Sequence, residues 1–388
     1  MSPLEPTTPA IRSRLPQVGT TIFTVMSALA QETGAVNLGQ GFPDFDCDPA
    51  LVDHVTAAMR EGLNQYPPMT GLPVLRERVA DKIAALYGRR YDAATEITIT
   101  AGATQAILTA VLCCVQPGNE VIVLEPCYDS YGPSIELAGG SVVRVPLTPG
   151  SFRPDFARIA AAMTPRTRLL MINSPHNPSA TVWTAAEMQQ LADLLVPTQV
   201  LLLSDEVYEH MVFDGVPHVS ASSIAMLAAR AFVVSSFGKT FHVTGWKVGT
   251  VAAPAALTTE FRKVHQFNVF TVNTPVQHGL ARYLSDPLPY RELPAFYQRK
   301  RDLFRDGLAR TRLRALPSQG TYFQLVDYSG VSTLPEAEFC QWLTREIGVA
   351  AIPLSVFYDG GFEQGLARLC FAKRDETLLA ALERLARL

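Results

Sequence analysis

Between residues 95 and 250, strand-like apolar runs alternate with segments of helical character. The runs predict strands at 96–100, 120–124, 168–172, 200–203 and 231–234. Runs that are apolar throughout indicate strands buried on both faces, as in a parallel sheet covered by crossover helices. One crossover helix has a clear start, because Thr184 and Glu187 form a capping box ahead of 188–196. The sequence therefore predicts an α/β fold around a mostly parallel central sheet.

Each predicted strand is followed by a polar cluster. These clusters are residues 101–104, 125–131, 173–178, 204–208 and 235–239. In an open α/β sheet, ligands bind beyond the carboxyl ends of the strands. We therefore expect the five clusters to build one site at one edge of the sheet.

Lys239 lies just past the predicted strand 231–234. A lysine amine that loses part of its hydration has a lowered pKa and attacks carbonyl groups. This is the requirement for a Schiff base (aldimine) with pyridoxal phosphate (PLP), a cofactor that acts as an electron sink. Because most lysines at strand ends are solvated charges, this interpretation depends on the neighbouring clusters.

Gly102, Ala103 and Thr104 lie where a strand passes into a helix. Free backbone N–H groups and a hydroxyl at a helix start form a suitable cradle for a phosphate. Ser236 and Lys247 are candidates to complete the phosphate site. The alternative interpretation of 101–104 is a simple turn between strand and helix.

Asp205 comes just after the run of four apolar residues 200–203 and Ser204, and a buried carboxylate needs a compensating partner. A protonated pyridine nitrogen would be such a partner, whereas a helix-capping role is the alternative. Asn177 and Tyr208 are candidates to hydrogen-bond the phenolate oxygen of the cofactor ring, and Tyr128 offers an aromatic face. Lys239, Asp205 and Tyr208 are the predicted catalytic residues.

Arg368 lies within the apolar run 366–371. An arginine in a buried strand is seldom unpaired, so a bidentate contact with a substrate carboxylate would explain it. The alternative is an internal salt bridge.

Beyond about residue 280 the pattern changes to an α+β type. A charged helix is predicted at 294–312, and Pro335 and Gly348 bound a second helix. Asp375 is expected to cap a final helix that runs to the C-terminus, and near the N-terminus a helix over 20–30 ends near Gly34. Short strands are predicted in a partly antiparallel sheet, at 321–326, 349–353 and 367–371.

The chain has 388 residues and a net charge of −3, which argues against nucleic acid or an anionic membrane as the main partner. No apolar run approaches the roughly 20 residues of a membrane span, and the N-terminus lacks an apolar signal core. The six cysteines and seven histidines show no disulfide framework or metal-ligand spacing. We therefore expect a cytoplasmic location and no protein-held metal.

Four of these segments together resemble the PLP-dependent aminotransferases of class I and II, which have fold type I. They are 173–178 (Asn-Ser-Pro-His-Asn-Pro), 204–208 (Ser-Asp-Glu-Val-Tyr), 235–239 (Ser-Ser-Phe-Gly-Lys) and the Arg368 strand. Their order and the 34 positions between Asp205 and Lys239 fit that family. The segments 39–45, 66–71, 237–247 and 369–373 are similar to its methionine and kynurenine aminotransferase branch, and the likeness runs from about Leu15 to the C-terminus.

The resemblance implies a large PLP-binding domain at 46–280, a small C-terminal domain at 281–388, and an N-terminal arm at 1–45 that joins the small domain. It implies that Lys239 also carries a proton between the substrate and the cofactor. Tyr66 would reach the phosphate of a neighbouring subunit, so the working unit would be a homodimer with shared active sites.

The resemblance also implies a substrate site. Gly41 and Asn177 would join Arg368 around the substrate carboxylate, with Tyr66 from the other subunit close by. Phe23, and Phe270 of the other subunit, would wall an apolar side-chain pocket suited to methionine or aromatic amino acids. Kynurenine aminotransferases commonly have a histidine after that second phenylalanine, and Thr271 stands there in this chain. The implied reaction is ping-pong transfer of an amino group to a 2-oxo acid, and methionine is favoured over kynurenine.

Two other activities remain open from the sequence. The same cofactor site would support β-elimination from cysteine S-conjugates, because one carbanion serves both reactions. A non-catalytic PLP-binding regulator is the other alternative, although the chain lacks the basic N-terminal domain of such proteins and keeps Asp205, Lys239 and Arg368.

Overall fold

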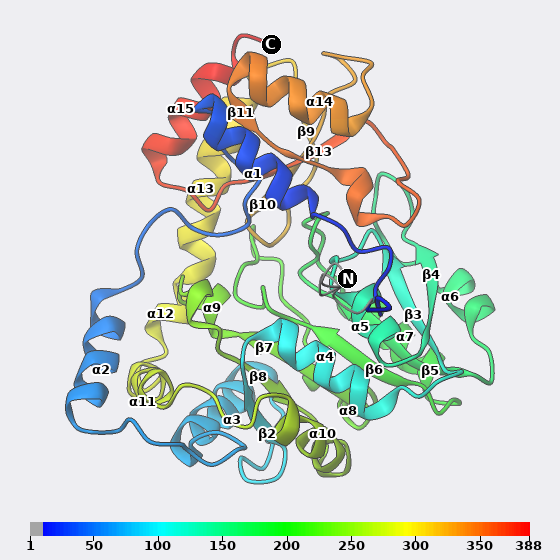
Figure 1. Ribbon diagram of the computed structural model, residues 1–388, viewed down its shortest axis with the longest axis vertical. Coiled ribbons are helices and arrows are strands. Elements are labelled where there is room, and N and C mark those ends of the chain that lie inside the picture. Colours follow the sequence, from blue (N-terminus) through cyan, green and yellow to red (C-terminus); the bar gives the residue numbers. More distant parts are fainter. Residues whose placement is uncertain (1–10) are drawn as a thin grey trace, which may run out of the picture.

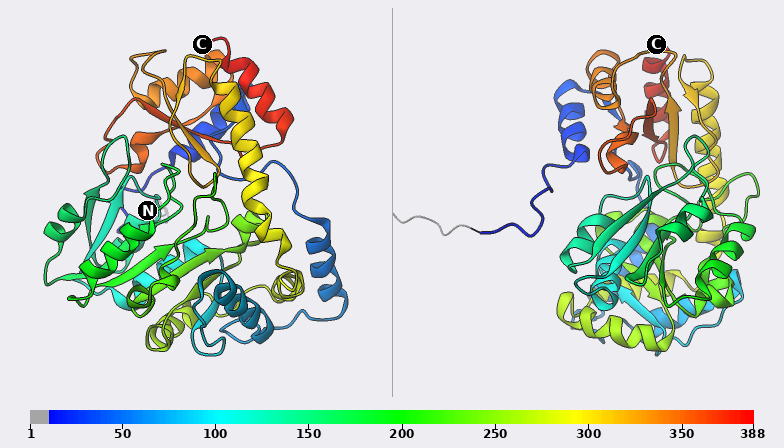
Figure 2. Two further views of the ribbon diagram at one scale, coloured as in Figure 1. Left: turned by 180° about the vertical axis from the view of Figure 1, so that it is seen from behind. Right: turned by 90° about the vertical axis from the view of Figure 1, so that its right-hand side faces the viewer.

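The computed structural model describes residues 11–388, which form two lobes. The lower lobe in Figure 1 contains a seven-stranded sheet, and the upper lobe contains a four-stranded sheet together with the N-terminal helix. Figure 2 shows from two further sides that the helix α13 (Leu293–Leu308) runs from one lobe into the other.

The large sheet has the strand order β2-β8-β7-β6-β5-β3-β4. All neighbours are parallel except β8, which runs antiparallel to β2 and β7. The predicted mostly parallel α/β sheet is therefore confirmed. The strands are β2 (Ile97–Thr100), β3 (Glu120–Glu125), β4 (Ser141–Pro146), β5 (Thr167–Asn173), β6 (Leu201–Asp205), β7 (Ala231–Ser236) and β8 (Gly249–Ala252).

Apolar side chains pack on both faces of this sheet. In β3, Val121 and Val123 face a cluster with Ile107 of α4, whereas Ile122 faces the cluster that contains Met188 of α7. This alternation explains why the central strands are apolar throughout. The helices of this lobe are α2 (Pro49–Arg60), α3 (Pro73–Tyr87), α4 (Ala103–Cys114), α5 (Tyr131–Leu137), α6 (Phe156–Ala162), α7 (Ala185–Leu195), α8 (Ala225–Ala228), α9 (Phe237–Thr240), α10 (Ala255–Asn268) and α11 (Thr274–Tyr283), with the 3-10 turns η1 (Ala221–Ser223) and η2 (Thr244–Trp246).

The predicted start of α7 is confirmed. The Thr184 hydroxyl accepts a hydrogen bond from the Glu187 amide at 3.2 Å, and the Glu187 carboxylate accepts one from the Thr184 amide at 2.8 Å. Two of the free N–H groups at this helix start are therefore satisfied.

The upper lobe is built on an antiparallel sheet of order β12-β13-β10-β9. The N-terminal segment joins this lobe, because β1 (Val36–Asn37) pairs in parallel with β11 (Val349–Ala350). Its other elements are α1 (Ile22–Thr33), β9 (Arg314–Ala315), β10 (Phe323–Asp327), α14 (Glu336–Trp342), the π-helical turn η3 (Leu343–Ile347), β12 (Ile352–Pro353), η4 (Leu354–Phe357), β13 (Leu366–Cys370) and α15 (Asp375–Leu385). The short helix α12 (Leu288–Arg291) lies at the lower end of α13, where Tyr290 packs against His210 of the lower lobe (Figure 1).

Two predicted helix ends are confirmed in this lobe, and one predicted cap is wrong. Gly34 and Gly348 end α1 and η3 with φ of 65° and 81°, a conformation that favours glycine. Asp375 does not cap α15, because Arg374 holds the cap position and makes no side-chain capping bond. The Asp375 carboxylate instead accepts a hydrogen bond from Lys300 Nζ at 2.8 Å.

Over residues 11–388, no helix combines the length and the apolar character needed to cross a membrane. Within the same range, no group of three or more His, Cys, Asp and Glu side chains is arranged to hold a metal ion. The cytoplasmic location stays a prediction.

Candidate active site

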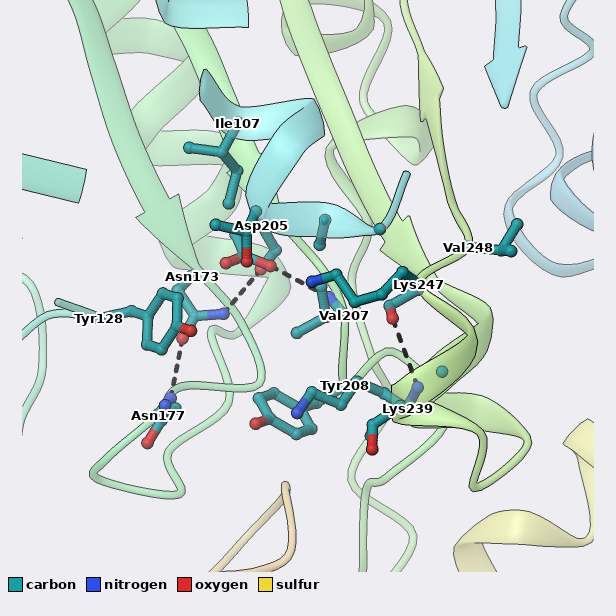
Figure 3. Close-up of a pocket in the computed structure, with 16 residues that line it drawn as sticks. Ile107, Tyr128, Asn173, Asn177, Asp205, Val207, Tyr208, Lys239, Lys247 and Val248 are labelled. Carbon is teal, nitrogen blue, oxygen red and sulfur yellow. Dashed lines mark hydrogen bonds between the residues drawn. The ribbon is translucent and has the colours of Figure 1, made fainter. Parts of the chain in front are cut away.

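A cavity of about 180 Å³ lies where the polar clusters meet beyond the carboxyl ends of the strands (Figure 3). Apart from Tyr66, all the residues predicted to hold the cofactor line it. They are Gly102, Ala103, Thr104, Tyr128, Asn177, Asp205, Tyr208, Ser236, Lys239 and Lys247. The structure therefore brings the polar clusters together at one site, as predicted.

Lys239 extends from α9, the short helix that directly follows β7. The backbone N–H of Lys239 donates to the Ser236 hydroxyl at 3.4 Å, which orients the first turn. Its Nζ donates to the Tyr322 hydroxyl at 3.0 Å and lies 3.5 Å from the Gly41 carbonyl. Burial lowers the pKa of Lys239 to about 8, so a neutral, nucleophilic amine is accessible near physiological pH.

One end of the cavity is the N-terminus of α4. Gly102 occupies the cap position with φ of 80° and offers no side chain to the free N–H groups of Ala103 and Thr104. A Cβ at Gly102 would lie 3.5 Å from Lys247 Nζ, so the space above the helix start is bounded by an ammonium group. Ser236 lines the same cavity. This combination of helix N-terminus, hydroxyl and cation suits a phosphate.

Asp205 lies at the end of β6 and is 4% exposed. Its carboxylate accepts hydrogen bonds from the Tyr131 hydroxyl at 2.6 Å and from the Val207 amide at 3.3 Å. Burial raises the pKa of Asp205 to about 6, and the Tyr131 hydrogen bond opposes this rise. A buried carboxylate favours a cationic partner, and within residues 11–388 no cation forms an ion pair with Asp205.

Asn173 connects the elements around this carboxylate. Its side chain donates to the Asp205 carbonyl at 2.8 Å and accepts from the Asn177 amide at 2.8 Å (Figure 3). Asn177 is thereby held beside Tyr208, a buried side chain whose pKa burial raises well above its ordinary value. Tyr208 therefore stays a hydrogen-bond donor across the physiological pH range.

A second cavity of about 270 Å³ adjoins the first. The two share Tyr128, Asn177, Tyr208 and Lys239, so the Lys239 amine lies at their junction. The second cavity is lined from both lobes, by Phe23, Gln40, Gly41, Phe42, Asp129, Phe323 and Arg368 in addition to the shared four.

Arg368 is the buried cation of this second cavity. Its guanidinium donates to Asn177 Oδ1 at 2.7 Å and to the Gly39 carbonyl at 3.1 Å, and it stacks on the Phe323 ring at 3.9 Å. Both acceptors are neutral, Arg368 Nε has no partner, and no ion pair to Arg368 is formed within residues 11–388. The internal salt bridge considered from the sequence is therefore absent from this part of the chain, and the group is free to bind a carboxylate.

Two predicted site residues lie outside both cavities. Tyr66 is 80% exposed, Phe270 is 45% exposed, and their rings meet edge to face with centroids 5.3 Å apart. The other predicted substrate residues, Phe23, Gly41, Asn177 and Arg368, do line the second cavity. A role for Tyr66 and Phe270 in the site of a second subunit stays a prediction.

The structure adds three residues that sequence reasoning did not single out. Tyr131 and Asn173 orient Asp205 and Asn177. Both lie in the polar clusters 125–131 and 173–178 noted in the sequence, so their position was a usable signal. Tyr322 contacts Lys239 from the upper lobe, and nothing in its local sequence marks it.

The arrangement combines an amine nucleophile, a phosphate cradle, a buried carboxylate and a carboxylate-binding arginine around two joined cavities. Such a set can hold a phosphorylated carbonyl compound against an amino or oxo acid. The Lys239 amine lies between them and is able to exchange protons.

The sequence profile of the family "Aminotransferase class I and II" matches residues 33–385. The methionine aminotransferase of Escherichia coli (strain K12) is 53% identical over 97% of this chain and 98% of that protein. Kynurenine–oxoglutarate transaminase 1 of Rattus norvegicus is 33% identical over 96% of each.

Two solved structures show the same fold. The crystal structure of YbdL from Escherichia coli, reported with a methionine aminotransferase function, superposes with a TM-score of 0.96 at 53% identity and covers 99% of this chain and 100% of that one. N-succinyldiaminopimelate aminotransferase from Mycobacterium tuberculosis gives a TM-score of 0.94 at 40% identity, over 97% and 100%. The chain belongs to the class I and II aminotransferases, and it is a transaminase.

Proposed function

We propose that this transaminase uses pyridoxal phosphate to move the amino group of methionine, or of another apolar or aromatic L-amino acid, to a 2-oxo acid in a ping-pong reaction. The observation that carries the proposal is the Lys239 amine at the junction of two cavities. One cavity offers a phosphate cradle and a buried carboxylate, and the other offers Arg368 and three phenylalanines.

Pyridoxal phosphate fits the first cavity. The N-terminus of α4, with Ser236 and Lys247, would hold the phosphate, and Asp205 would pair with the protonated ring nitrogen. Asn177 and Tyr208 would hydrogen-bond the phenolate oxygen, and Tyr128 would face the ring. When bound, the cofactor supplies an electron sink for the electrons of a broken Cα–H bond.

The protein's own groups then bind, orient and move a proton. Arg368 binds the substrate carboxylate with the help of Asn177, and its guanidinium is held against the Phe323 ring on which it stacks. The Lys239 amine takes the proton from the substrate α-carbon, and its pKa near 8 suits a base that must also return the proton. After the first 2-oxo acid product leaves, a different 2-oxo acid binds and passes through the same steps in reverse order. This alternation makes the kinetics ping-pong.

The second cavity favours an apolar side chain. Phe23, Phe42 and Phe323 line it, and its two buried cations are Arg368 and Lys239, which the carboxylate and the proton transfer require. The 53% identity to a methionine aminotransferase supports methionine as donor, and kynurenine aminotransferases are more distant, at 33–34%. We further propose a homodimer in which Tyr66 and Phe270 complete the partner's site.

The test is the visible spectrum of the PLP-loaded protein before and after methionine is added without an oxo acid. We expect the yellow band of bound PLP to be replaced by the band of pyridoxamine phosphate, and Lys239→Ala to lose turnover by several orders of magnitude. Lys263→Ala is the matched control, because Lys263 is an exposed lysine of α10 paired with Glu260.

Three outcomes would change the proposal. A protein that stays colourless with PLP would contradict the role of Lys239. If other amino acids but not methionine convert the bound PLP, the amino donor is one of those amino acids and not methionine. Pyruvate and ammonia released from a cysteine S-conjugate in the absence of an oxo acid would instead indicate β-elimination.

A further inference from the structure

Tyr322 makes a direct bridge between the two lobes at the reactive amine. Its hydroxyl accepts a hydrogen bond from Lys239 Nζ at 3.0 Å and donates one to the Gly41 carbonyl at 2.5 Å. The three residues are 83, 198 and 281 positions apart along the chain. This contact is therefore made by the folded structure and by no local motif.

The direction of the two hydrogen bonds is determined by chemistry. A backbone carbonyl can only accept, so the phenol must donate its proton to Gly41. The lone pairs of the phenol oxygen are then left for Lys239 and for the Tyr208 hydroxyl, which is also hydrogen-bonded to Tyr322. Burial raises the pKa of Tyr322 far above its ordinary value, so this donor proton remains in place at physiological pH.

The amine is enclosed as well as hydrogen-bonded. Lys239 Nζ lies 5.7 Å from the ring centroids of both Tyr208 and Tyr322, and the Gly41 carbonyl lies 3.5 Å away. A side chain does not fit at Gly41, because a Cβ at this position would come within 2.8 Å of the Phe323 ring. The amine thus has a defined resting place between the two tyrosine rings and the Gly41 carbonyl.

Packing alone does not require the Tyr322 hydroxyl. The ring lies edge-on against Tyr208 and Phe323, with centroids 5.2 Å and 4.9 Å apart, and phenylalanine would keep these contacts. The hydroxyl serves hydrogen bonds instead: it bonds Lys239 and Gly41, and it is also hydrogen-bonded to the Tyr208 hydroxyl. Those bonds must therefore account for a tyrosine here.

We propose that Tyr322 is a positioning residue that docks the free amine of Lys239 on the Gly41 carbonyl, at the boundary of the cofactor and substrate cavities. This inference rests on the proposed function, because the amine is free only while the amino acid, and not Lys239, is joined to the cofactor. A lysine has a long flexible side chain, and a dock keeps its amine within reach of the substrate α-carbon.

The test compares Tyr322→Phe with Tyr297→Phe. Tyr297 is a buried tyrosine of the same aromatic cluster, with its ring centroid 5.8 Å from that of Tyr322, and its hydroxyl has no partner. With methionine we expect Tyr322→Phe to lower kcat about tenfold. We also expect it to increase the isotope effect of α-deuterated methionine, while the affinity for PLP measured by absorbance stays within twofold.

A second readout needs no cofactor. The rate at which acetic anhydride modifies Lys239 in the cofactor-free protein at pH 7 can be followed by mass spectrometry of the peptide that contains Lys239. Loss of the Tyr322 acceptor disfavours the ammonium form, so we expect the modification to accelerate several-fold. The other groups that face the amine, namely Asp205, Lys247, Arg368 and Cys370, stay in place in both variants.

The inference is overturned if Tyr322→Phe matches Tyr297→Phe in kcat, isotope effect and modification rate. It is also overturned if kcat falls only together with PLP affinity and thermal stability, which would indicate a role in packing. Failure of the wild-type protein to convert methionine or any other amino acid would count against the proposed function alone. The modification rate would still test whether Tyr322 positions the Lys239 amine.

Discussion

Asp205 shows at the level of one residue how this site is prepared for a cation. The carboxylate is buried at the end of β6, its two hydrogen-bond donors are neutral, and its pKa is raised to about 6, mainly by burial. A folded-state pKa above the unfolded one means that folding favours the protonated form. The stability associated with Asp205 is therefore present below pH 4 and is lost as the pH rises through 6.

Asp205→Asn should stabilise the cofactor-free protein at neutral pH. The shift from an ordinary aspartate pKa corresponds to about 3 kcal/mol at pH 7, which a neutral side chain of the same shape would recover. We expect urea unfolding to show a gain of about 2–3 kcal/mol at pH 7 that shrinks below pH 5, together with a large loss of turnover. A variant that is less stable than wild type at pH 7 would contradict this account.

The predictability of site residues from sequence depended on where their partners lie. Asp205, Asn177 and Lys239 lie at or just beyond the ends of strands, so chain position alone indicated that they would converge. Tyr322 reaches the same site from the other lobe, and its partners are 83 and 281 positions away. A contact of that kind depends on how the lobes pack, which no local pattern reports.

At the level of elements, Glu336 in the first turn of α14 connects three segments of the upper lobe. The carboxylate is fully buried and accepts hydrogen bonds from the backbone amides of Ser355, Gln364 and Leu366. Leu366 begins β13, the strand that carries Arg368. The position of Arg368, the proposed substrate-binding arginine, therefore depends on a carboxylate outside both cavities.

Glu336→Gln should loosen this connection. A glutamine would direct its NH2 group at one of the three backbone donors and leave that donor unsatisfied, at a cost of about 1–3 kcal/mol in unfolding free energy. We expect the KM for methionine to rise while the affinity for PLP, which the other lobe is proposed to bind, stays unchanged. Glu338→Gln is the control on the exposed side of the same turn and should change stability by less than about 0.5 kcal/mol.

Burial explains which strands could be predicted from the sequence. The central strands β3, β5, β6 and β7 were expected, because burial on both faces leaves an unbroken apolar run. The edge strand β4 has a half-exposed sequence with an arginine, and β8 is four residues long and begins with Gly249, so neither gives such a run. The strand β9, with two residues, is defined by its pairing with β10 alone.

At the level of the whole molecule, the second cavity, the proposed substrate site, takes residues from both lobes and from the N-terminal segment. The exposed side chains add a further requirement. Tyr66 and Phe270 form an exposed pair, and Phe267 is 88% exposed, although all three are aromatic. Exposed apolar groups that lie together indicate a surface that another molecule covers. A second copy of this chain, with Tyr66 entering its site, would cover them and complete both sites.

Mixing two inactive variants tests that arrangement. Lys239→Ala chains lack the amine but keep Tyr66, whereas Tyr66→Ala chains keep the amine and lack the tyrosine. If Tyr66 acts in the partner's site, each mixed dimer has one intact site, and refolding an equal mixture should regain about a quarter of wild-type activity. With Lys239→Ala chains in large excess, activity per Tyr66→Ala chain should approach that of a wild-type chain. If Tyr66 acts within its own chain, no mixed dimer contains an intact site, and the mixture stays as inactive as its parts.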